Sequence, residues 1–346
     1  MDEMKELLEL AAGPHEWDER PVFCFTSDVD WASEAVMEEY FRLLPPELLR
    51  LTVFVTHKSD MIEQAFQSGR LHRGIHPNFL PGSSHGDTFR EVIETCLSFA
   101  PEATCSRSHR AFDVTDTAHL LRNDYHIRCC SNTITTLTPR ITPYWLESKL
   151  LQVPVFFEDG SFLYNELGLS IEPYRSFFTA PGLKVISLHP MNMVFNTPYL
   201  AWMRQIKDSL SRDAFNHIDT GTIARHRNRE RGIFNTAEEI LNLAHQLNAP
   251  ILTLDEIYEL TISQQTNDTP YIPKTFHKQP RRGKTREAQL TPHKAKPQCG
   301  DGNQNPHKRS CSVGMGTRTH TSEAAVWGWE PEPTQAKPQC GNINDK

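Results

Sequence analysis

Short apolar runs alternate along residues 20–262 with stretches in which apolar residues recur every three or four positions. The runs 22–26 and 51–56 are typical of buried strands, and Ser33 is placed to cap a helix with one apolar face. The same alternation continues downstream. Further strands are predicted at 104–108, 126–130, 153–157, 184–188 and 251–254, and further helices begin at Asp60, near Asp87, at Thr236 (with Glu239 as a capping box) and at Asp255.

Repeated βα units with buried strands favour a parallel sheet that is closed or nearly closed. We therefore expect an α/β fold, a distorted (β/α) barrel, over residues 20–262, preceded by a helical extension at 1–19. In such a barrel the reactive side chains lie at the C-terminal ends of the strands. This rule selects the candidate site residues.

Residues 263–346 differ from the rest of the chain in composition. They are rich in Gln, Thr, Pro, Lys, His, Asn and Gly, and repeat the hexapeptide Ala-Lys-Pro-Gln-Cys-Gly at 295–300 and 336–341. With few apolar residues to bury, this segment is predicted to be a disordered, basic, low-complexity tail.

Charge and composition exclude several classes of protein. The tail carries 13 basic and 7 acidic residues, a net charge of +6, so the chain's net charge of −7 leaves −13 on residues 1–262. An acidic body argues against nucleic acid as a partner. No apolar run is long enough for a transmembrane helix, and the acidic N-terminus lacks the apolar core of a secretory signal. The eight cysteines form no C-x-x-C pair, so we expect free thiols in a reducing cytoplasm.

Two carboxylates, Asp28 and Asp30, follow the first predicted strand. In regular strand geometry they share one face, where they repel unless a cation or a proton lies between them. One could bind a divalent metal while the other takes a proton from metal-bound water. A solvated loop that caps the next helix is the alternative.

Histidines supply the other candidate metal ligands. His76 precedes a proline, which favours extended backbone and suits a ligand on a loop. His85, nine residues later across a Gly-Ser-Ser turn, is the expected second imidazole, although it could be a surface histidine; His72 and His57 are weaker candidates. Imidazole with carboxylate suits zinc, and also cobalt, nickel or iron.

Later strand ends carry the remaining candidates. Arg107 needs a carboxylate partner if it is buried, and beside Asp28 it would orient that base, with His109 and Arg110 competing for the role. Asp159, or its neighbour Glu158, could orient Arg107, line the pocket or form a surface turn. His189 ends an apolar strand, where it could act as a general acid or be a packed core residue.

Taken in order, these residues resemble the polysaccharide deacetylase family (NodB-homology domain, carbohydrate esterase family 4), whose five motifs follow the strands of a distorted (β/α) barrel. The matching segments are Phe25–Asp30, Gly74–His76, Arg107–His109 and Val185–His189. The segments 76–79 and 82–86 look like a cytoplasmic branch found with bacterial surface-polysaccharide synthesis genes. The chain departs from the family at Leu80, where a second histidine is usual, and in its fourth motif, for which Asp159 is the best match.

The resemblance implies metal-dependent hydrolysis of an N-acetyl group on a sugar or polysaccharide precursor. The resemblance makes Asp28 the general base and His189 the general acid. It makes Arg107 and Asp159 further catalytic residues. The ligands of the divalent metal, with zinc expected first, are then Asp30, His76 and His85. Two alternatives stay open. One is a catalytically silent carbohydrate-binding component of polysaccharide synthesis. The other is another barrel metallohydrolase, such as a phosphoesterase, with the arginine run 225–231 as a phosphate clamp. The sequence does not specify an oligomeric state.

Overall fold

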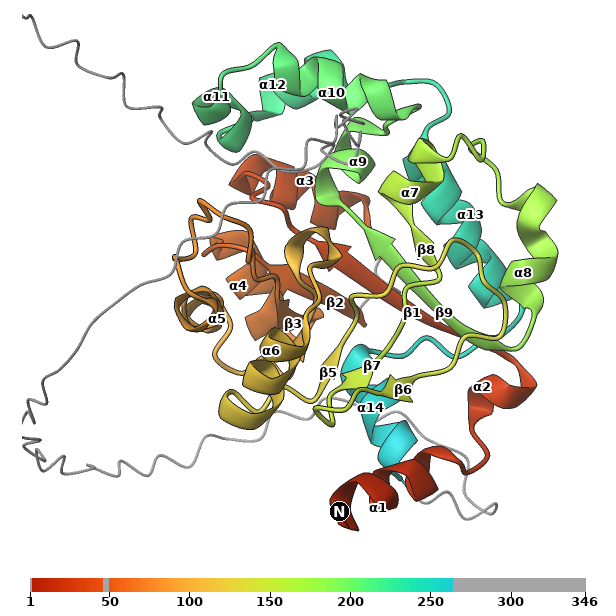
Figure 1. Cartoon of the computed structure of the whole chain (residues 1–346). Coiled ribbons are helices and arrows are strands. Elements are labelled where there is room, and N and C mark those ends of the chain that lie inside the picture. The colour runs from red at the N-terminus through yellow and green to blue at the C-terminus, as the bar shows by residue number, and fades with distance from the viewer. Residues whose placement is uncertain (1, 46–49, 264–346) are drawn as a thin grey trace, which may run out of the picture. The chain divides into compact units, whose positions relative to one another are not determined.

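The computed structural model of the chain describes residues 2–45 and 50–263. Within them a nine-stranded sheet runs in the order β6-β7-β5-β4-β3-β2-β1-β9-β8 (Figure 1). The strands are β1 Pro21–Asp28, β2 Leu51–Val55, β3 Leu71–Ile75, β4 Cys105–Ser106, β5 Cys129–Cys130, β6 Tyr144–Trp145, β7 Leu151–Gln152, β8 Phe157–Glu158 and β9 Gly182–Leu188.

The sheet is parallel except at one edge, where β6 runs antiparallel to β7. β1 lies near the middle and pairs over most of its length with β9, from Pro21 opposite Gly182 to Ser27 opposite Leu188. In the described part of the chain the edge strands β6 and β8 do not pair with each other, so the curled sheet is a half-barrel open on one side. The predicted α/β barrel fold is confirmed in this open form.

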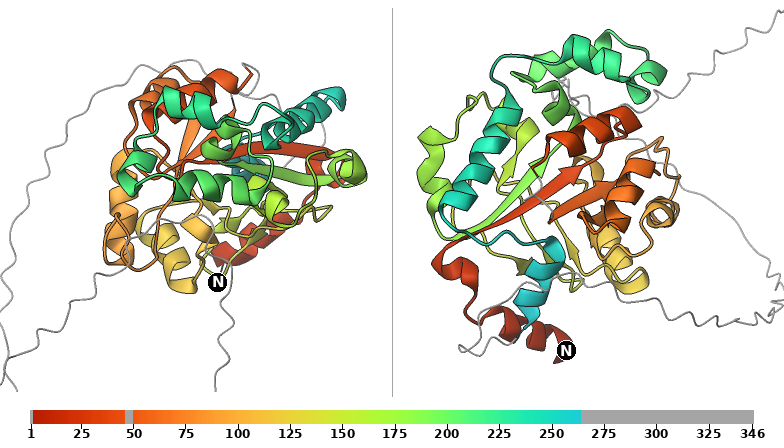
Figure 2. Two further views of the ribbon diagram at one scale, coloured as in Figure 1. Left: turned by 90° about the horizontal axis from the view of Figure 1, so that it is seen from above. Right: turned by 180° about the vertical axis from the view of Figure 1, so that it is seen from behind.

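Helices cover the sheet and cap its upper end (Figures 1 and 2). They are α1 Asp2–Ala11, α2 Glu16–Glu19, α3 Glu34–Leu43, α4 Asp60–Gln67, α5 Phe89–Phe99, α6 Thr115–His119, α7 Asp159–Tyr164, α8 Arg175–Thr179, α9 Pro190–Phe195, α10 Leu200–Asp208, α11 Arg212–Asn216, α12 Thr220–His226, α13 Ile233–Gln246 and α14 Leu254–Ile262. Short turns of helix, η2 His109–Ala111, η3 Leu120–Asp124 and η4 Glu172–Tyr174, lie between them.

The central strands are mostly apolar, and the helices that lie on the sheet exclude water from them. Every residue of β1, β2 and β9 is buried. The helices that follow β1 and β2 begin where the sequence places them: the Ser33 and Ser59 hydroxyls accept hydrogen bonds from the backbone N–H groups of Val36 and Ile62. These two βα connections fix the polar residues just after each strand.

Several local predictions need correction. Residues 71–75, which the sequence left unassigned, form β3, whereas 153–156 lie between β7 and β8. The predicted strands 104–108 and 126–130 are shortened to Cys105–Ser106 and Cys129–Cys130. The predicted strand 251–254 is reduced to a single bridge between Ile251 and Phe23. Helix α13 begins at Ile233, so Thr236 lies inside it and donates its hydroxyl to the carbonyl of Leu169 rather than capping.

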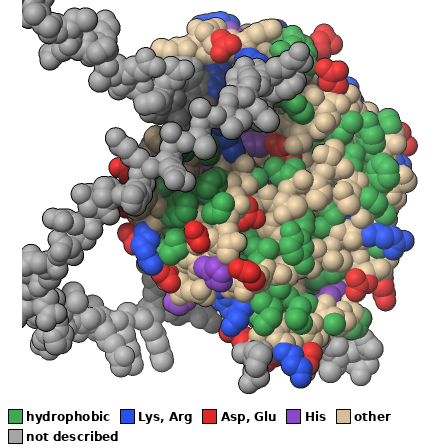
Figure 3. All heavy atoms as spheres, in the orientation of Figure 1, with side chains coloured by type: hydrophobic (Ala, Val, Ile, Leu, Met, Phe, Trp, Pro, Cys, Tyr) green, Lys and Arg blue, Asp and Glu red, His purple; other side chains and the backbone are tan. Residues whose placement is uncertain are grey.

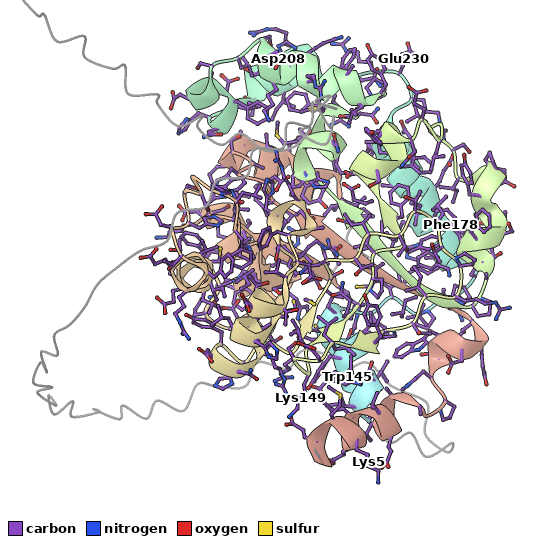
Figure 4. All side chains as sticks on the ribbon, viewed as in Figure 1. Lys5, Trp145, Lys149, Phe178, Asp208 and Glu230 are labelled. Carbon is purple, nitrogen blue, oxygen red and sulfur yellow. The ribbon has the colours of Figure 1, made fainter. Side chains whose placement is uncertain are left out.

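At the N-terminus, α1 packs against α14 and β6. The indole N–H of Trp145 donates to the carbonyl of Leu7 at 3.1 Å, and Lys149 forms an ion pair with Glu3 of α1 (Figure 4). The predicted tail lies outside the described residues, apart from Ser263. Among the helices that the structure describes, none has the length and apolarity needed to cross a bilayer.

Candidate active site

Three side chains from three strand ends converge at the C-terminal edge of the sheet. Oδ1 of Asp30, after β1, lies 3.1 Å from Nε2 of His76, after β3. The same oxygen lies 3.0 Å from Nδ1 of His109, after β4. Their ligand atoms all lie within 4.8 Å of one another. One carboxylate and two imidazoles are a donor set that suits zinc and related divalent metals.

The charge on Asp30 is stabilised by this arrangement. Burial opposes ionisation of the carboxyl group, but the surrounding imidazoles of His109, His76 and His189 outweigh burial and hold the pKa of Asp30 well below its usual range. The group therefore presents an ionised carboxylate oxygen between two imidazole nitrogens.

Asp28, two residues earlier, is held apart from this group by Arg107. The guanidinium donates from Nη1 to Oδ1 of Asp28 at 2.9 Å, and to the hydroxyls of Thr26 and Ser187. Its other edge donates from Nε and Nη2 to the carbonyl and hydroxyl of Ser131. Arg107 and Asp28 are 3% and 5% exposed, so this ion pair is fixed by hydrogen bonds on both sides.

The guanidinium of Arg107 also packs against the aromatic ring of Phe54 in β2. The Cζ atom of Arg107 lies 4.6 Å from the ring centroid of Phe54 in β2. Beside that ring is Gly74 of β3, where a Cβ atom would come within 2.6 Å of Phe54. Glycine at 74 therefore leaves room for the ring on which Arg107 rests.

His189, directly after β9, lies beside the candidate metal-ligand group, which is formed by Asp30, His76 and His109. Its backbone N–H donates to Oδ2 of Asp159 at 2.8 Å, and its Nδ1 lies 2.6 Å from Oδ1 of the same carboxylate. The other ring nitrogen, Nε2, faces Asp28 at 3.9 Å and Asp30 at 3.6 Å. Burial lowers the pKa of His189, but Asp159, Asp30 and Glu158 raise it more, to well above its usual value.

The structure thus brings together Asp28, Asp30, His76, Arg107 and, through His189, Asp159. It does not bring His85 to them. Nε2 of His85 donates to the carbonyl of Thr56 at 2.8 Å, and its Nδ1 accepts from the backbone N–H of Asn78 at 3.1 Å. Burial lowers the pKa of His85 to about 4, which keeps the ring neutral. With both nitrogens bonded to backbone, His85 holds the 76–85 loop in place and has no nitrogen left for a metal.

His109, which the sequence suggests only as a competitor of Arg107, supplies the second imidazole beside Asp30. A signal for it was present, because Arg107 and His109 have the same spacing of two as Asp28 and Asp30, and both pairs follow a strand. Each pair contributes one residue to the ion pair and one to the metal-ligand group.

The other weighed candidates lie in other surroundings. His72 is on β3, 4.0 Å from Asp255, and His57 contacts the hydroxyl of Thr56. In the arginine run, Arg227 donates to the carbonyl of Val194, and Arg231 donates to the carbonyl of Leu169 and pairs with Glu239. Those two arginines hold the loop before α13.

A hollow opens toward the strand ends. The C-terminal ends of β1 and β9 point upward in Figure 1, toward α9 and α10. On this side the space-filling view shows His and Asp/Glu side chains beside Lys and Arg in a hollow under the uppermost helices (Figure 3). The geometry therefore combines a candidate metal-ligand group, an oriented carboxylate and an oriented imidazole at the C-terminal edge of the sheet.

The family model described as WbmS-like polysaccharide deacetylase matches residues 25–207, more than half of the chain. This range contains all of the site residues described above. No curated protein gives a significant match.

Among solved structures, one is a Bordetella bronchiseptica protein assigned as a polysaccharide deacetylase involved in O-antigen biosynthesis. It has 22% sequence identity and a TM-score of 0.56, over 64% of this chain and 89% of that chain. The Bc1960 peptidoglycan N-acetylglucosamine deacetylase has 12% identity and a TM-score of 0.37, over 69% and 88% of the two chains. A T48 deacetylase has 10% identity and a TM-score of 0.33, over 71% and 94%.

The last two similarities are too low to bear on the fold, whereas the first supports the deacetylase type of half-barrel. With the family match over residues 25–207, these findings agree with the family resemblance of the strand-end motifs. The chain belongs to the WbmS-like polysaccharide deacetylase family.

Proposed function

We propose that the protein hydrolyses an N-acetyl group on a sugar used in bacterial surface-polysaccharide synthesis, with a divalent cation held by Asp30, His76 and His109. The donor set fits zinc best and also accepts cobalt, nickel or iron. Bound there, the cation supplies a Lewis acid that polarises the amide carbonyl and makes a water molecule more acidic. The family match and the resemblance of the first assigned structure support an acetylated sugar as substrate.

In this proposal Asp28 is the general base. Arg107 holds the carboxylate through Oδ1, while Oδ2 accepts a long hydrogen bond of 3.4 Å from the hydroxyl of Ser187. That oxygen lies 3.9 Å from Nε2 of His189, and the same nitrogen lies 3.6 Å from Oδ2 of Asp30. Asp28 takes the proton from the attacking water, and a new C–O bond forms at the amide carbon.

His189 is the general acid. Asp159 fixes the ring through Nδ1, so the Nε2 side is the one that can deliver a proton into the site. The raised pKa of His189 favours the imidazolium form. When the C–N bond breaks, His189 protonates the departing amine, and the products are acetate and an amino sugar.

One observation carries the proposal: a separately held carboxylate, Asp28, and a separately held imidazole, His189, flank one metal-ligand group. The test is acetate release from N-acetyl sugars, measured beside the metal content of the same purified protein. Metal-dependent acetate release that a chelator abolishes and zinc restores is the expected result. Bound metal with no acetate release from any N-acetyl sugar contradicts it and favours the silent carbohydrate-binding alternative.

A further inference from the structure

The turn that carries Asp30 has a tryptophan, Trp31, at a position where glycine is usual. The backbone N–H of Ala32 donates to the carbonyl of Val29 at 3.0 Å, and both central residues have positive φ, 47° at Asp30 and 56° at Trp31. Positive φ at both central positions is the pattern of a type I′ turn. Aspartate is common in the first of these positions, but the second is usually glycine because a side chain is strained there.

Tryptophan at the glycine position costs backbone strain that the surroundings must compensate. The hydroxyl of Thr56 accepts a hydrogen bond from the Trp31 N–H at 3.0 Å, which holds the residue in this conformation. A glycine would form the same turn without strain. The turn conformation alone therefore does not explain why residue 31 is tryptophan, so the indole must have another role.

The indole lies against two histidines of the site. Its ring centroid is 5.2 Å from that of His109, in an edge-to-face arrangement, and 5.4 Å from that of His85. Those histidines are 2% and 4% exposed, whereas Trp31 keeps part of its surface open. Trp31 is thus a partly exposed aromatic residue in contact with a histidine of the candidate metal-ligand group.

We propose that Trp31 is the stacking platform for the pyranose ring of the substrate, an inference that rests on the proposed function. Aromatic faces carry partial negative charge, and the C–H groups on one face of a pyranose carry partial positive charge, so the two surfaces attract each other and exclude water. Since Trp31 directly follows Asp30 and touches His109, a sugar stacked on it lies beside the cation. Its N-acetyl group is then within reach of Asp28 and His189.

The test separates substrate binding from catalysis. In an Asp28→Asn background, binding of N-acetylglucosamine and its β-1,4-linked tetramer is measured by calorimetry with Trp31, Trp31→Phe and Trp31→Leu. Trp31→Leu is expected to weaken binding about tenfold, which corresponds to ~1.4 kcal/mol, while Trp31→Phe restores most of it. Trp145→Leu, at a part-buried indole beside α1, is the matched control and leaves binding unchanged.

Two further measurements complete the design. In the otherwise unchanged protein, Trp31→Leu is expected to raise KM for acetate release with kcat nearly constant, at normal zinc content. Loss of zinc in both Trp31 variants overturns the platform, because the indole then only supports His109. Unchanged binding and KM in Trp31→Leu overturn it as well.

The outcomes distinguish the two proposals. If the wild-type protein releases acetate but sugar binding does not depend on Trp31, only the proposed role of Trp31 as a stacking platform is contradicted. Sugar binding that depends on Trp31 without any acetate release removes the proposed deacetylation alone and leaves the platform standing. Absence of binding by both probes in the Asp28→Asn protein counts against both.

Discussion

Nδ1 of His109 lies 3.0 Å from Oδ1 of Asp30, although the two residues are 79 positions apart in the chain. Parallel strands place the ends of β1 and β4 at the same edge of the sheet, so a residue after each strand reaches the same point. This contact makes His109 the third ligand in the proposed metal centre, in the role that the sequence analysis assigned to His85.

The first prediction concerns this choice of ligand. Replacing His109 by Gln is expected to remove most of the bound metal, since a neutral amide is a much poorer zinc ligand than imidazole. His85→Gln is the matched control and should keep its metal, because its ring already bonds to two backbone groups. Metal analysis of the two purified variants checks the prediction, and the opposite pattern would restore His85 as the ligand.

The second prediction separates the base from the ligand. Asp28→Asn is expected to lower kcat by about 10³-fold or more with metal content nearly unchanged, because Asn cannot accept the proton but still fits beside Arg107. Asp30→Asn should instead lose metal together with activity. The measurement is acetate release beside metal content for both proteins. Equal metal loss in both variants would show that Asp28 is itself a ligand.

The sequence predicted the sheet and most of the strand-end residues because both depend on local patterns. The buried strands β1, β2 and β9 are mostly apolar, and charged residues stand at or directly after the ends of β1 and β9. The strand β3 was missed because it contains His72, Arg73 and Gly74, which lack a strand pattern. Arg73 is buried in ion pairs with Glu63 and Glu102, partners that the local sequence does not reveal.

The choice between His85 and His109 depended on the fold rather than on local sequence. His85 is nine residues from His76 in the chain, but its ring turns toward the carbonyl of Thr56. His109 is much farther along the chain, but β4 pairs directly with β3 through Ser106 and Ile75. Proximity in sequence favours His85, whereas strand pairing places His109 against Asp30.

The third prediction tests Asp159 as the residue that positions His189. Asp159→Asn is expected to lower kcat by about 10²- to 10⁴-fold with little change in metal content, because an amide neither fixes the tautomer of the ring nor stabilises the imidazolium. The carboxylate is fully buried and accepts from both the backbone N–H and the ring of His189.

Glu158→Gln is the control for Asp159. Its Oε1 lies 3.7 Å from Nδ1 of His189, and its carboxylate also caps α7 through the N–H of Ser161. We expect a much smaller loss of kcat in this variant. The ¹⁵N chemical shifts of the His189 ring provide a readout besides rate: they should indicate loss of the imidazolium form in Asp159→Asn. Equal effects in both variants would mean that Glu158 and Asp159 together stabilise the imidazolium of His189, rather than Asp159 alone.

The fourth prediction concerns stability away from the site, at Lys184 near the start of β9. This residue is fully buried, and its Nζ atom lies 3.3 Å from the carbonyl of Pro181 and 4.8 Å from the ring centroid of Phe156. Burial, with a further contribution from Arg140, lowers the pKa of Lys184 to about 8. Charged lysine therefore opposes folding at neutral pH.

The sign of the pH dependence follows from this shift. Between pH 8 and about 10.4, the ordinary pKa of lysine, the unfolded chain holds a proton that the folded chain has released, so raising the pH through this range favours the folded state. The free energy of unfolding of the wild type should rise by about 2 kcal/mol relative to Lys184→Met between pH 7 and pH 10. At pH 7 the Met variant should be at least as stable as the wild type, because it removes a buried charge while filling similar volume. Urea unfolding of both proteins at the two pH values measures this difference, and a constant difference between them would mean that the buried amine does not titrate in this range.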